Sequence, residues 1–582
     1  MDVQSESGDR DGRVRLRPPP KGGQRVLRTE ERSQTDVAAL PTAATMTGGE
    51  ALVASLATNG VSTIFGLPGV QLDGAFDALH AARETVRVVH TRHEQGAAYM
   101  ADGYARVTGE VGTCLVVPGP GLLNATAALS TAYACNSPVL CVTGQIQSDL
   151  IEFGRGLLHE IPNQLEMVRS VTKWARRAMT PEEIPTLVRE AFGELRTGRP
   201  RPVEIEIPPD TLFATADVKL LPREAQAPPF AGDPELLERA AAMLSNAAKP
   251  LIWAGGGVVR GGAAEALRRL AEMLQAPVVM TSNGKGALSD RHPLAQSILG
   301  AMELLPEADV ILAVGTRFVE PATAAWGLGP DRIVIQLDID VEEIGRNYSP
   351  TIGIEADASA GVAALADLVE TAGRERVSRE AELQALKDGL AARTQAVGPQ
   401  AEFAMAIRRA LPDDGIFVSE MTQVGYWSNL AFPVYQPRTY VTPGYQGTLG
   451  YGFPTALGAQ VALPERAVVS VNGDGGFGFC LNELATMARH EIPAVVVVFN
   501  DDAYGNVRRI QHEQFGGRTI ASDLRNPDFV ALAKAFGIGG RRVETPAALE
   551  EAVTEGIVAR EPLLIEVPLG PVPNPWRILG LR

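Results

Sequence analysis

Blocks of apolar and polar positions alternate along most of the chain, and the pattern is clearest on either side of residue 480. A valine-rich run at 467–471 is followed by a glycine-rich turn at 473–476 and a helical pattern at 481–490. A second apolar run covers 494–499. Near-continuous apolar runs on both sides of a helix are typical of parallel strands buried on both faces. The pattern therefore predicts a strand, a turn, a helix and a second, parallel strand.

Polar residues stand at the ends of both predicted strands. Asp474 follows the first strand, and Asn500 and Asp501 follow the second. A right-handed crossover brings both carboxyl ends to one edge of the sheet, where open α/β sheets bind ligands. Oxygen ligands suit Mg²⁺, and glycines at a helix N-terminus suit a phosphate. Asp474 alone could instead cap an ordinary helix, but its spacing from Asn500 favours the cation site.

The same alternation recurs in three segments and predicts three α/β domains with doubly wound parallel sheets. Residues 1–45 lack an apolar period and are rich in Arg and Pro, so a disordered tail is expected there. The folded pattern begins at Met46, which suggests a dispensable tail or a start site assigned too far upstream. The expected domains are 46–215, 232–375 and 401–570, with a linker at 376–400 and a C-terminal tail at 571–582.

Composition narrows the class of protein. The chain has 582 residues, of which 45% are hydrophobic and 21% charged, as in an ordinary globular protein. A net charge of −16 argues against a nucleic-acid partner, and no apolar run is long enough to cross a membrane. The four cysteines lack C-x-x-C or metal-site spacing, which predicts buried free thiols in a reducing cytoplasm.

The stretch after residue 466 resembles the thiamine diphosphate motif, in which G-D-G is followed, one helix and one strand later, by N-N. The resemblance implies that Mg²⁺ is held by Asp474, Asp501 and the carbonyl of Ala503. Asp501 stands where the family usually has Asn, and its extra charge should tighten Mg²⁺ binding and weaken cofactor binding without the metal. The implied cofactor contacts in this stretch are Gly473, Asp474, Gly475, Gly476, Asn500, Gly505 and Asn506.

Residues 46–570 as a whole resemble the acetolactate synthase-like group, which includes acetohydroxyacid synthase large subunits and benzoylformate decarboxylase. The segments F-G-L-P-G, R-H-E-Q-G-A-A-Y, G-P-G-L-L-N and V-T-G-Q occur in family order. The resemblance implies pyrimidine-binding, central and diphosphate-binding domains, and a homodimer or homotetramer with active sites between subunits. It makes Glu94 the carboxyl that bonds the aminopyrimidine ring, although a helix N-terminus favours a carboxylate in any case. It makes Leu449 the wedge beneath the bent cofactor, and Pro68, Gly69 and Gln423 further cofactor contacts.

The region expected to face the substrate departs from the synthase pattern. Ile510 stands where synthases place Trp, and Leu158-His159-Glu160 replaces F-Q-E. His159 is a candidate acid–base residue, or else a partly exposed loop histidine. Arg508 and Arg509 could bind a substrate carboxylate, or could lie on a solvated helix face.

The central segment D-I-D-V-E-E-I-G, at 338–345, resembles a flavin-contacting pattern that also occurs in relatives without FAD. The stretch after Gly300 is shorter than in synthases and lacks M-H-G, so FAD is left open but disfavoured. The expected enzyme uses thiamine diphosphate and Mg²⁺ for acetolactate synthase-like carboligation of 2-oxo acids. The alternative is a 2-oxo acid decarboxylase or C–C lyase. A non-catalytic partner subunit is a further alternative, against which the intact Glu94 and Asp474 argue.

Overall fold

The protein is described from a computed structural model, which describes residues 43–318 and 332–578. Most of the expected N-terminal tail, residues 1–42, lies outside the described residues, as do residues 579–582 of the expected C-terminal tail. Met46 lies in strand β1 (Ala44–Thr47), which pairs with β8 (Thr215–Val218) in a small antiparallel sheet. Within the described ranges, no helix has the length and apolar character that crossing a bilayer requires.

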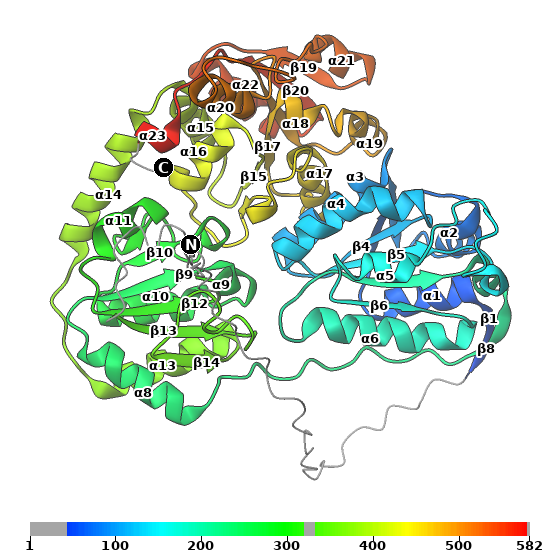
Figure 1. Ribbon diagram of the computed structural model, residues 1–582, viewed down its shortest axis with the longest axis horizontal. Helices are drawn as coiled ribbons and strands as arrows, with labels where there is room; N and C mark the ends of the chain where they lie inside the picture. Colours follow the sequence, from blue (N-terminus) through cyan, green and yellow to red (C-terminus); the bar gives the residue numbers. More distant parts are fainter. Residues whose placement is uncertain (1–42, 319–331, 579–582) are drawn as a thin grey trace, which may run out of the picture. The chain divides into compact units, whose positions relative to one another are not determined.

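Three sheets of six parallel strands, each flanked by helices, make up the described chain (Figure 1). This confirms the predicted fold class. The first sheet contains, in spatial order, β3 (Arg87–His90), β2 (Thr63–Gly66), β4 (Gly112–Val116), β5 (Val139–Gly144), β7 (Val203–Ile207) and β6 (Trp174–Arg177). The helices of this part are α1 (Gly48–Thr58), α2 (Asp73–Ala81), α3 (Glu94–Thr108), α4 (Pro120–Ala134), α5 (Gln164–Val168), α6 (Ile184–Arg196) and α7 (Pro209–Phe213).

The central sheet has the strand order of a dinucleotide-binding fold, with the first strand in the middle. Its strands are β11 (Ala295–Gln296), β10 (Val278–Met280), β9 (Pro250–Ala254), β12 (Val310–Val314), β13 (Ile333–Asp338) and β14 (Ile352–Glu355). Its helices are α8 (Pro234–Asn246), α9 (Gly256–Arg260), α10 (Ala264–Leu274), α11 (Ala301–Leu304) and α13 (Ala358–Ala372). Helix α14 (Glu380–Gln395) follows it and occupies most of the expected linker.

The third sheet repeats the strand order of the first. It contains β16 (Tyr440–Val441), β15 (Ile416–Ser419), β17 (Val468–Gly473), β18 (Val495–Asn500), β20 (Leu563–Pro568) and β19 (Gly539–Arg542). Its helices are α15 (Pro399–Ala410), α16 (Gln423–Ala431), α17 (Gly452–Ala462), α18 (Asp474–Phe477), α19 (Leu484–Arg489), α20 (Gly505–Gln514), α21 (Phe529–Ala535), α22 (Pro546–Ala559) and α23 (Pro575–Ile578). In both sheets the first and third strands in chain order are neighbours, which places a topological switch point, the usual ligand position, between them.

The segment after β17 corrects one expectation from the sequence. The glycine turn predicted at 473–476 is wrong, because β17 runs on to Gly473 and the short helix α18 starts at Asp474. The helix predicted at 481–490 is present as α19 and the residues just before it. A short 3₁₀ turn then precedes α19. Gly475 and Gly476 are therefore helical, and they serve close packing. A Cβ on Gly475 would collide with the Tyr504 ring, and one on Gly476 with the Glu420 carboxylate.

Helices α3 and α17 cross with no space for side chains between them. A Cβ on Gly103 would overlap the carbonyl oxygen of Thr455, and one on Gly458 would overlap that of Met100. Nearby, the hydroxyl of Tyr451 donates to the buried carboxylate of Asp102 over 3.1 Å. This contact joins the N-terminus of α17 to the middle of α3, and so joins the third part of the chain to the first.

Candidate functional site

Glu94 lies at the carboxyl edge of the first sheet, where it begins α3 after β3. His93, rather than Glu94, caps this helix, because its ring accepts a hydrogen bond from the backbone of Gln95. The Glu94 carboxylate instead accepts a 3.0 Å hydrogen bond from Asn124 of α4. The half-buried Glu94 therefore faces the N-terminus of the neighbouring helix, and helix capping does not account for it.

The Gly119–Gly121 turn, where the chain passes from β4 into α4, lies between Glu94 and the backbone of His159. Gly119 has φ of +56° and follows β4 at the switch point of the sheet. A Cβ on Gly121 would lie 3.4 Å from the Glu94 carboxylate, and one on Gly119 would collide with the carbonyl of His159. The structure thus brings His159 to the same turn as Glu94. Pro68 and Gly69 follow the adjacent strand β2, and a Cβ on Gly69 would overlap Val117.

The imidazole of His159 is part-buried, with its Nδ1 atom 3.0 Å from the side-chain oxygen of Gln71. Neither Gln71 nor Asn124 was predicted as a site residue. Asn124 belongs to the G-P-G-L-L-N segment and Gln71 follows Pro68-Gly69, so both stand within or next to the motifs that carry the family resemblance.

Asp474 lies at the matching edge of the third sheet, at the switch point between β15 and β17. Its side chain is 3% exposed, and its Oδ2 atom accepts hydrogen bonds from the Ala503 backbone at 3.2 Å and from Asn526 at 2.6 Å. Asn526 also donates to the side-chain oxygen of Asn500 at 2.9 Å. The structure therefore brings Asp474, Asn500 and Ala503 together, and Asn526, which sequence reasoning missed, links them.

The carboxyl of Asp501 lies beside that of Asp474 and is, like it, shielded from solvent. Burial, followed by the charge of Asp474, raises the pKa of Asp501 to about 7, although Arg508 opposes the change. Burial also raises the pKa of Asp474. Gly505 packs so closely against the carboxylate of Asp501 that a Cβ on this glycine would overlap it.

The two arginines of α20 are bonded to groups of the chain itself. Arg508 lies 3.7 Å from Asp501 and 3.3 Å from Asp523. Arg509 lies 3.0 Å from Glu513 and donates to the Asn506 side-chain oxygen at 2.6 Å. Their side chains are 27% and 17% exposed, so the expectation of a solvated helix face does not describe them.

Glu420 is a further buried carboxyl that sequence reasoning did not select as a site residue. It follows β15, and its Oε1 atom accepts hydrogen bonds from the backbone of Gly450 and of Tyr451, just before α17. These bonds fix the residues on the C-terminal side of Leu449, which is half-buried. Gln423 begins α16 three residues after Glu420. Burial raises the pKa of Glu420 to about 8.

The raised pKa of Glu420 predicts a pH-dependent stability. A carboxyl whose pKa rises on folding stabilises the fold fully below its ordinary pKa and progressively less as pH increases from 4.5 to about 8. We expect the Glu420→Gln variant to lack this loss, which is on the order of a few kcal/mol. Thermal unfolding of the cofactor-free protein across this pH range measures it. Glu110→Gln, at the exposed end of α3, is the control. Parallel pH profiles for wild type and Glu420→Gln would contradict the expectation.

The donor set at the third sheet fits a magnesium diphosphate. Mg²⁺ in proteins commonly takes one or two carboxylates and completes its shell with phosphate oxygens and water. Among the residues that the structure describes, no cluster of three His, Cys, Asp or Glu side chains forms a self-sufficient metal site. Asp474 and Asp501 would therefore hold the ion together with oxygens from a ligand.

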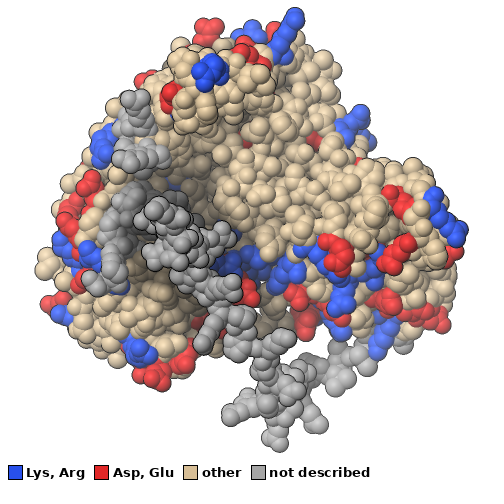
Figure 2. Space-filling view, viewed as in Figure 1, with Lys and Arg blue, Asp and Glu red and all other residues tan. Residues whose placement is uncertain are grey.

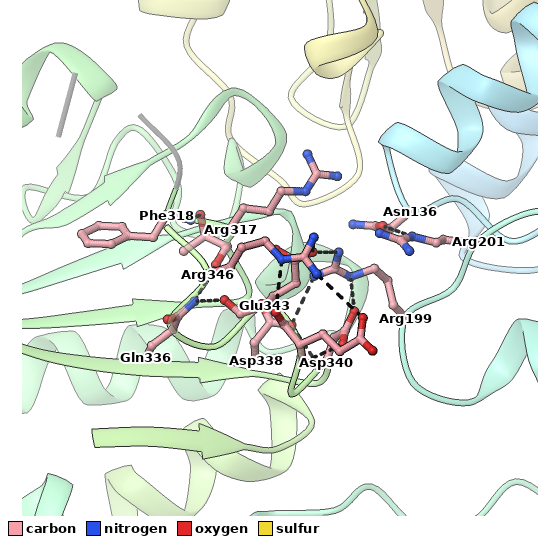
Figure 3. Close-up of polar contacts among 12 residues, drawn as sticks. Asn136, Arg199, Arg201, Arg317, Phe318, Gln336, Asp338, Asp340, Glu343 and Arg346 are labelled. Carbon is pink, nitrogen blue, oxygen red and sulfur yellow. Dashed lines mark hydrogen bonds and ion pairs between the residues drawn. The ribbon is translucent and has the colours of Figure 1, made fainter. Parts of the chain in front are cut away.

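A cavity of about 1220 Å³ lies away from these two edges, lined by residues of all three parts of the chain. Arginines outnumber acidic residues in its lining, and Figure 2 shows basic side chains gathered in the recessed middle of the face drawn. Buried Arg199 lies 2.9 Å from Glu343, 3.7 Å from Asp338 and 3.5 Å from Asp340 (Figure 3). Three of the four acidic residues of D-I-D-V-E-E-I-G thus form ion pairs with an arginine of the first domain.

Comparison with known proteins gives three matches to protein-family models. The N-terminal binding domain of thiamine pyrophosphate (thiamine diphosphate) enzymes matches residues 46–167, their central domain 237–365 and their C-terminal binding domain 420–567. A probable acetolactate synthase large subunit of Methanocaldococcus jannaschii is 35% identical over 90% of this chain and 92% of its own length.

Two further relatives carry different activities in their names. A probable 2-ketoarginine decarboxylase of Pseudomonas aeruginosa is 35% identical over 94% of this chain and 99% of its own length. The acetolactate synthase isozyme 3 large subunit of Escherichia coli is 33% identical over 88% and 92%, respectively. The chain is therefore similar, along nearly its whole length, to proteins named as synthases and to one named as a decarboxylase.

Proposed function

The chain belongs to the thiamine diphosphate-dependent enzymes of the acetolactate synthase-like group, and we propose that it makes or breaks the carbon–carbon bond next to the carbonyl of a 2-oxo acid. The observation that carries the proposal is the pair of half-sites at equivalent switch points. One presents Glu94 beside the Gly119–Gly121 turn, and the other presents Asp474 beside Asp501.

Bound thiamine diphosphate supplies the electron sink for a carbanion formed next to a carbonyl. Asp474, Asp501 and the carbonyl of Ala503 would hold Mg²⁺ and, through it, the diphosphate. Glu94 would exchange a proton with the aminopyrimidine ring, and Asn124 orients its carboxylate. Leu449 would support the bent cofactor from below, in a segment anchored by the bonds between Glu420 and the two residues after it.

The half-sites come from different sheets, and we expect two chains to combine them in a homodimer or in a homotetramer built as a dimer of dimers. Leu123, beside Asn124, is 45% exposed, and Phe479, which packs against Gly450, is 53% exposed. Exposed apolar residues next to both half-sites support a second chain that covers them. Glu94 of one subunit would then face Asp474 of the other, and a monomer would be inactive.

Acetolactate synthase-like carboligation is the first candidate reaction, because most of the relatives named above carry that activity in their names. Decarboxylation with release of an aldehyde is the second. The decarboxylase relative, aligned over 99% of its length, favours it, and so does His159, whose backbone packs against Gly119 and whose imidazole could donate the final proton.

Product analysis separates the two reactions. The purified protein is incubated with thiamine diphosphate, Mg²⁺ and a panel of 2-oxo acids that includes pyruvate and a guanidinium-bearing acid. An acetohydroxy acid or hydroxyketone supports carboligation, whereas CO₂ with an equal amount of aldehyde supports decarboxylation. Loss of all turnover on removal of the cofactor is expected for both. Absence of any consumption of 2-oxo acid would overturn the proposal.

We expect the purified protein to carry no flavin. The arginines of the large cavity suit an anionic ligand, but Gly300 is followed directly by the four-residue helix α11, where a flavin-contacting segment would lie. Arg199 also forms ion pairs with three acidic residues of the central motif, which are then not free to bind a flavin. The visible absorbance spectrum of the purified protein, before and after denaturation, tests this. A flavin band with one flavin per chain would contradict the expectation.

A further inference from the structure

The side chain of Gln71 bridges two neighbouring residues of the loop that carries His159. Gln71 is 7% exposed and lies in the 3₁₀ turn Val70–Leu72. Its amide nitrogen donates to the backbone carbonyl of Leu158 over 3.1 Å, and its amide oxygen lies 3.0 Å from Nδ1 of His159. A carbonyl oxygen can only accept, so the nitrogen of the amide must face Leu158 and its oxygen must face the imidazole.

This orientation determines where the imidazole carries its proton. Because the amide oxygen of Gln71 can only accept, Nδ1 of His159 must be the donor of their hydrogen bond. In the neutral ring the other nitrogen, Nε2, is then unprotonated and able to take up a proton. The hydrogen bond of one ring nitrogen thus sets the chemistry of the other.

The backbone holds the ring in place as well. His159 has φ of +68°, a conformation that costs free energy for a residue with a side chain and persists where neighbours impose it. Its carbonyl packs against Gly119, whose own N–H donates to Gln164 over 2.7 Å. Glu160, the next residue, accepts from the backbone of Leu157 over 2.8 Å and so closes the loop on itself.

We propose that Gln71 is a positioning residue that keeps Nδ1 of His159 protonated and Nε2 free, so that Nε2 carries the proton that the reaction consumes or releases. This inference rests on the proposed function and adds a second acid–base group to it. Nε2 takes up a proton from solvent water, which leaves imidazolium, and gives this proton to the carbanion carbon as the C–H bond forms, which restores the neutral ring, so that charge and protons balance. The charged groups on the elements packed nearby are Glu160, Glu94 beyond Gly121, and Glu206 behind Gln164.

Nuclear magnetic resonance of the histidine ring nitrogens reads the tautomer directly. The chain has seven histidines, so selective ¹⁵N labelling gives few signals, and His159→Gln identifies the one of interest. In the wild type, neutral His159 is expected to be protonated at Nδ1. In Gln71→Met, which keeps length but has no acceptor, we expect the Nε2-protonated form to appear. Gln147→Met makes the same change at an exposed position nearby and is expected to leave the signal unchanged. An unchanged tautomer in Gln71→Met would overturn the positioning role.

Kinetics test the consequence for the reaction. We expect Gln71→Met to lower kcat about 10-fold or more, with little change in KM or in cofactor binding, because proton transfer by a positioned group is worth about 100-fold or more. Gln71→Glu keeps an acceptor oxygen at Nδ1 and should rescue kcat in part, while the new charge shifts the pH at which kcat titrates upwards by about one unit or more. Full activity in His159→Gln would overturn the proton-transfer role. If the wild type turns over no 2-oxo acid, the proposed function fails, and the resonance experiment still decides whether Gln71 sets the tautomer.

Discussion

Replacing Glu94 with Gln is expected to lower turnover by a factor of about 100 to 10,000 and to leave cofactor binding nearly unchanged. The amide keeps the size of the side chain and can still pair with Asn124, which now donates 3.0 Å to the carboxylate. It cannot give up or accept the proton that the carboxyl exchanges with the cofactor ring. The variant therefore separates proton exchange from binding.

Two measurements check this result on the same preparation. Turnover is measured with the 2-oxo acid that the product assay identifies, and cofactor binding is measured by titration calorimetry with Mg²⁺ present. Glu110→Gln makes the same chemical change at the exposed C-terminal end of α3 and should behave as wild type. A Glu94→Gln enzyme with full turnover would show that this carboxyl does not take part in the chemistry.

Replacing Asp474 with Asn is expected to weaken binding of the Mg²⁺–cofactor complex by about 100-fold or more, since loss of even an outer-shell partner of a metal costs about 10- to 100-fold. Asp474 is 3% exposed and lies at the switch point of the third sheet. The side-chain nitrogen of Asn526 now donates a hydrogen bond of 2.6 Å to the Asp474 carboxylate. An amide nitrogen introduced at that oxygen would be a second donor and could not accept this bond. The variant should therefore lose both a charge and an ordered acceptor.

Asp501→Asn is the matched control, because it restores the residue that the family usually has at this position. We expect this variant to keep the cofactor, to need more Mg²⁺ for half-saturation, and to lose the carboxyl whose pKa is raised to about 7 by burial and by the charge of Asp474. Cofactor that remains bound after gel filtration, measured at several Mg²⁺ concentrations, distinguishes the two variants. Equal retention by Asp474→Asn and wild type would remove Asp474 from the metal site.

The fold class could be predicted from the sequence because the valine-rich strands are buried on both faces and carry a strong local signal. The same reasoning placed Asp474 and Asn500 at one edge, since the carboxyl ends of parallel strands meet there. The turn at 473–476 was wrongly predicted, because glycines that normally indicate a turn are here helical and are required by the close approach of the Tyr504 ring and the Glu420 carboxylate. Such contacts arise only when distant segments meet.

The residues that sequence reasoning missed share this property. Asn526 bonds a residue 52 positions earlier, Gln71 bonds one 88 positions later, and Glu420 bonds the backbone 30 positions later. None of them changes a local hydrophobic period, so no local pattern predicts its role. The substrate was beyond prediction for a related reason, because the positions of loop residues such as His159, which is proposed to act on it, depend on tertiary contacts.

The contact between α3 and α17 limits how the protein can open. Gly103 and Gly458 leave no gap that sliding or tilting could use, so the two helices act as one rigid piece. Glu94 begins α3 and Leu449 closely precedes α17, so these two residues of one chain cannot move apart to admit a cofactor. Any motion that admits cofactor or releases product would therefore involve segments outside this contact. The contact between α3 and α17 thus makes this part of the chain rigid, and the motions that turnover needs fall to other parts of the chain.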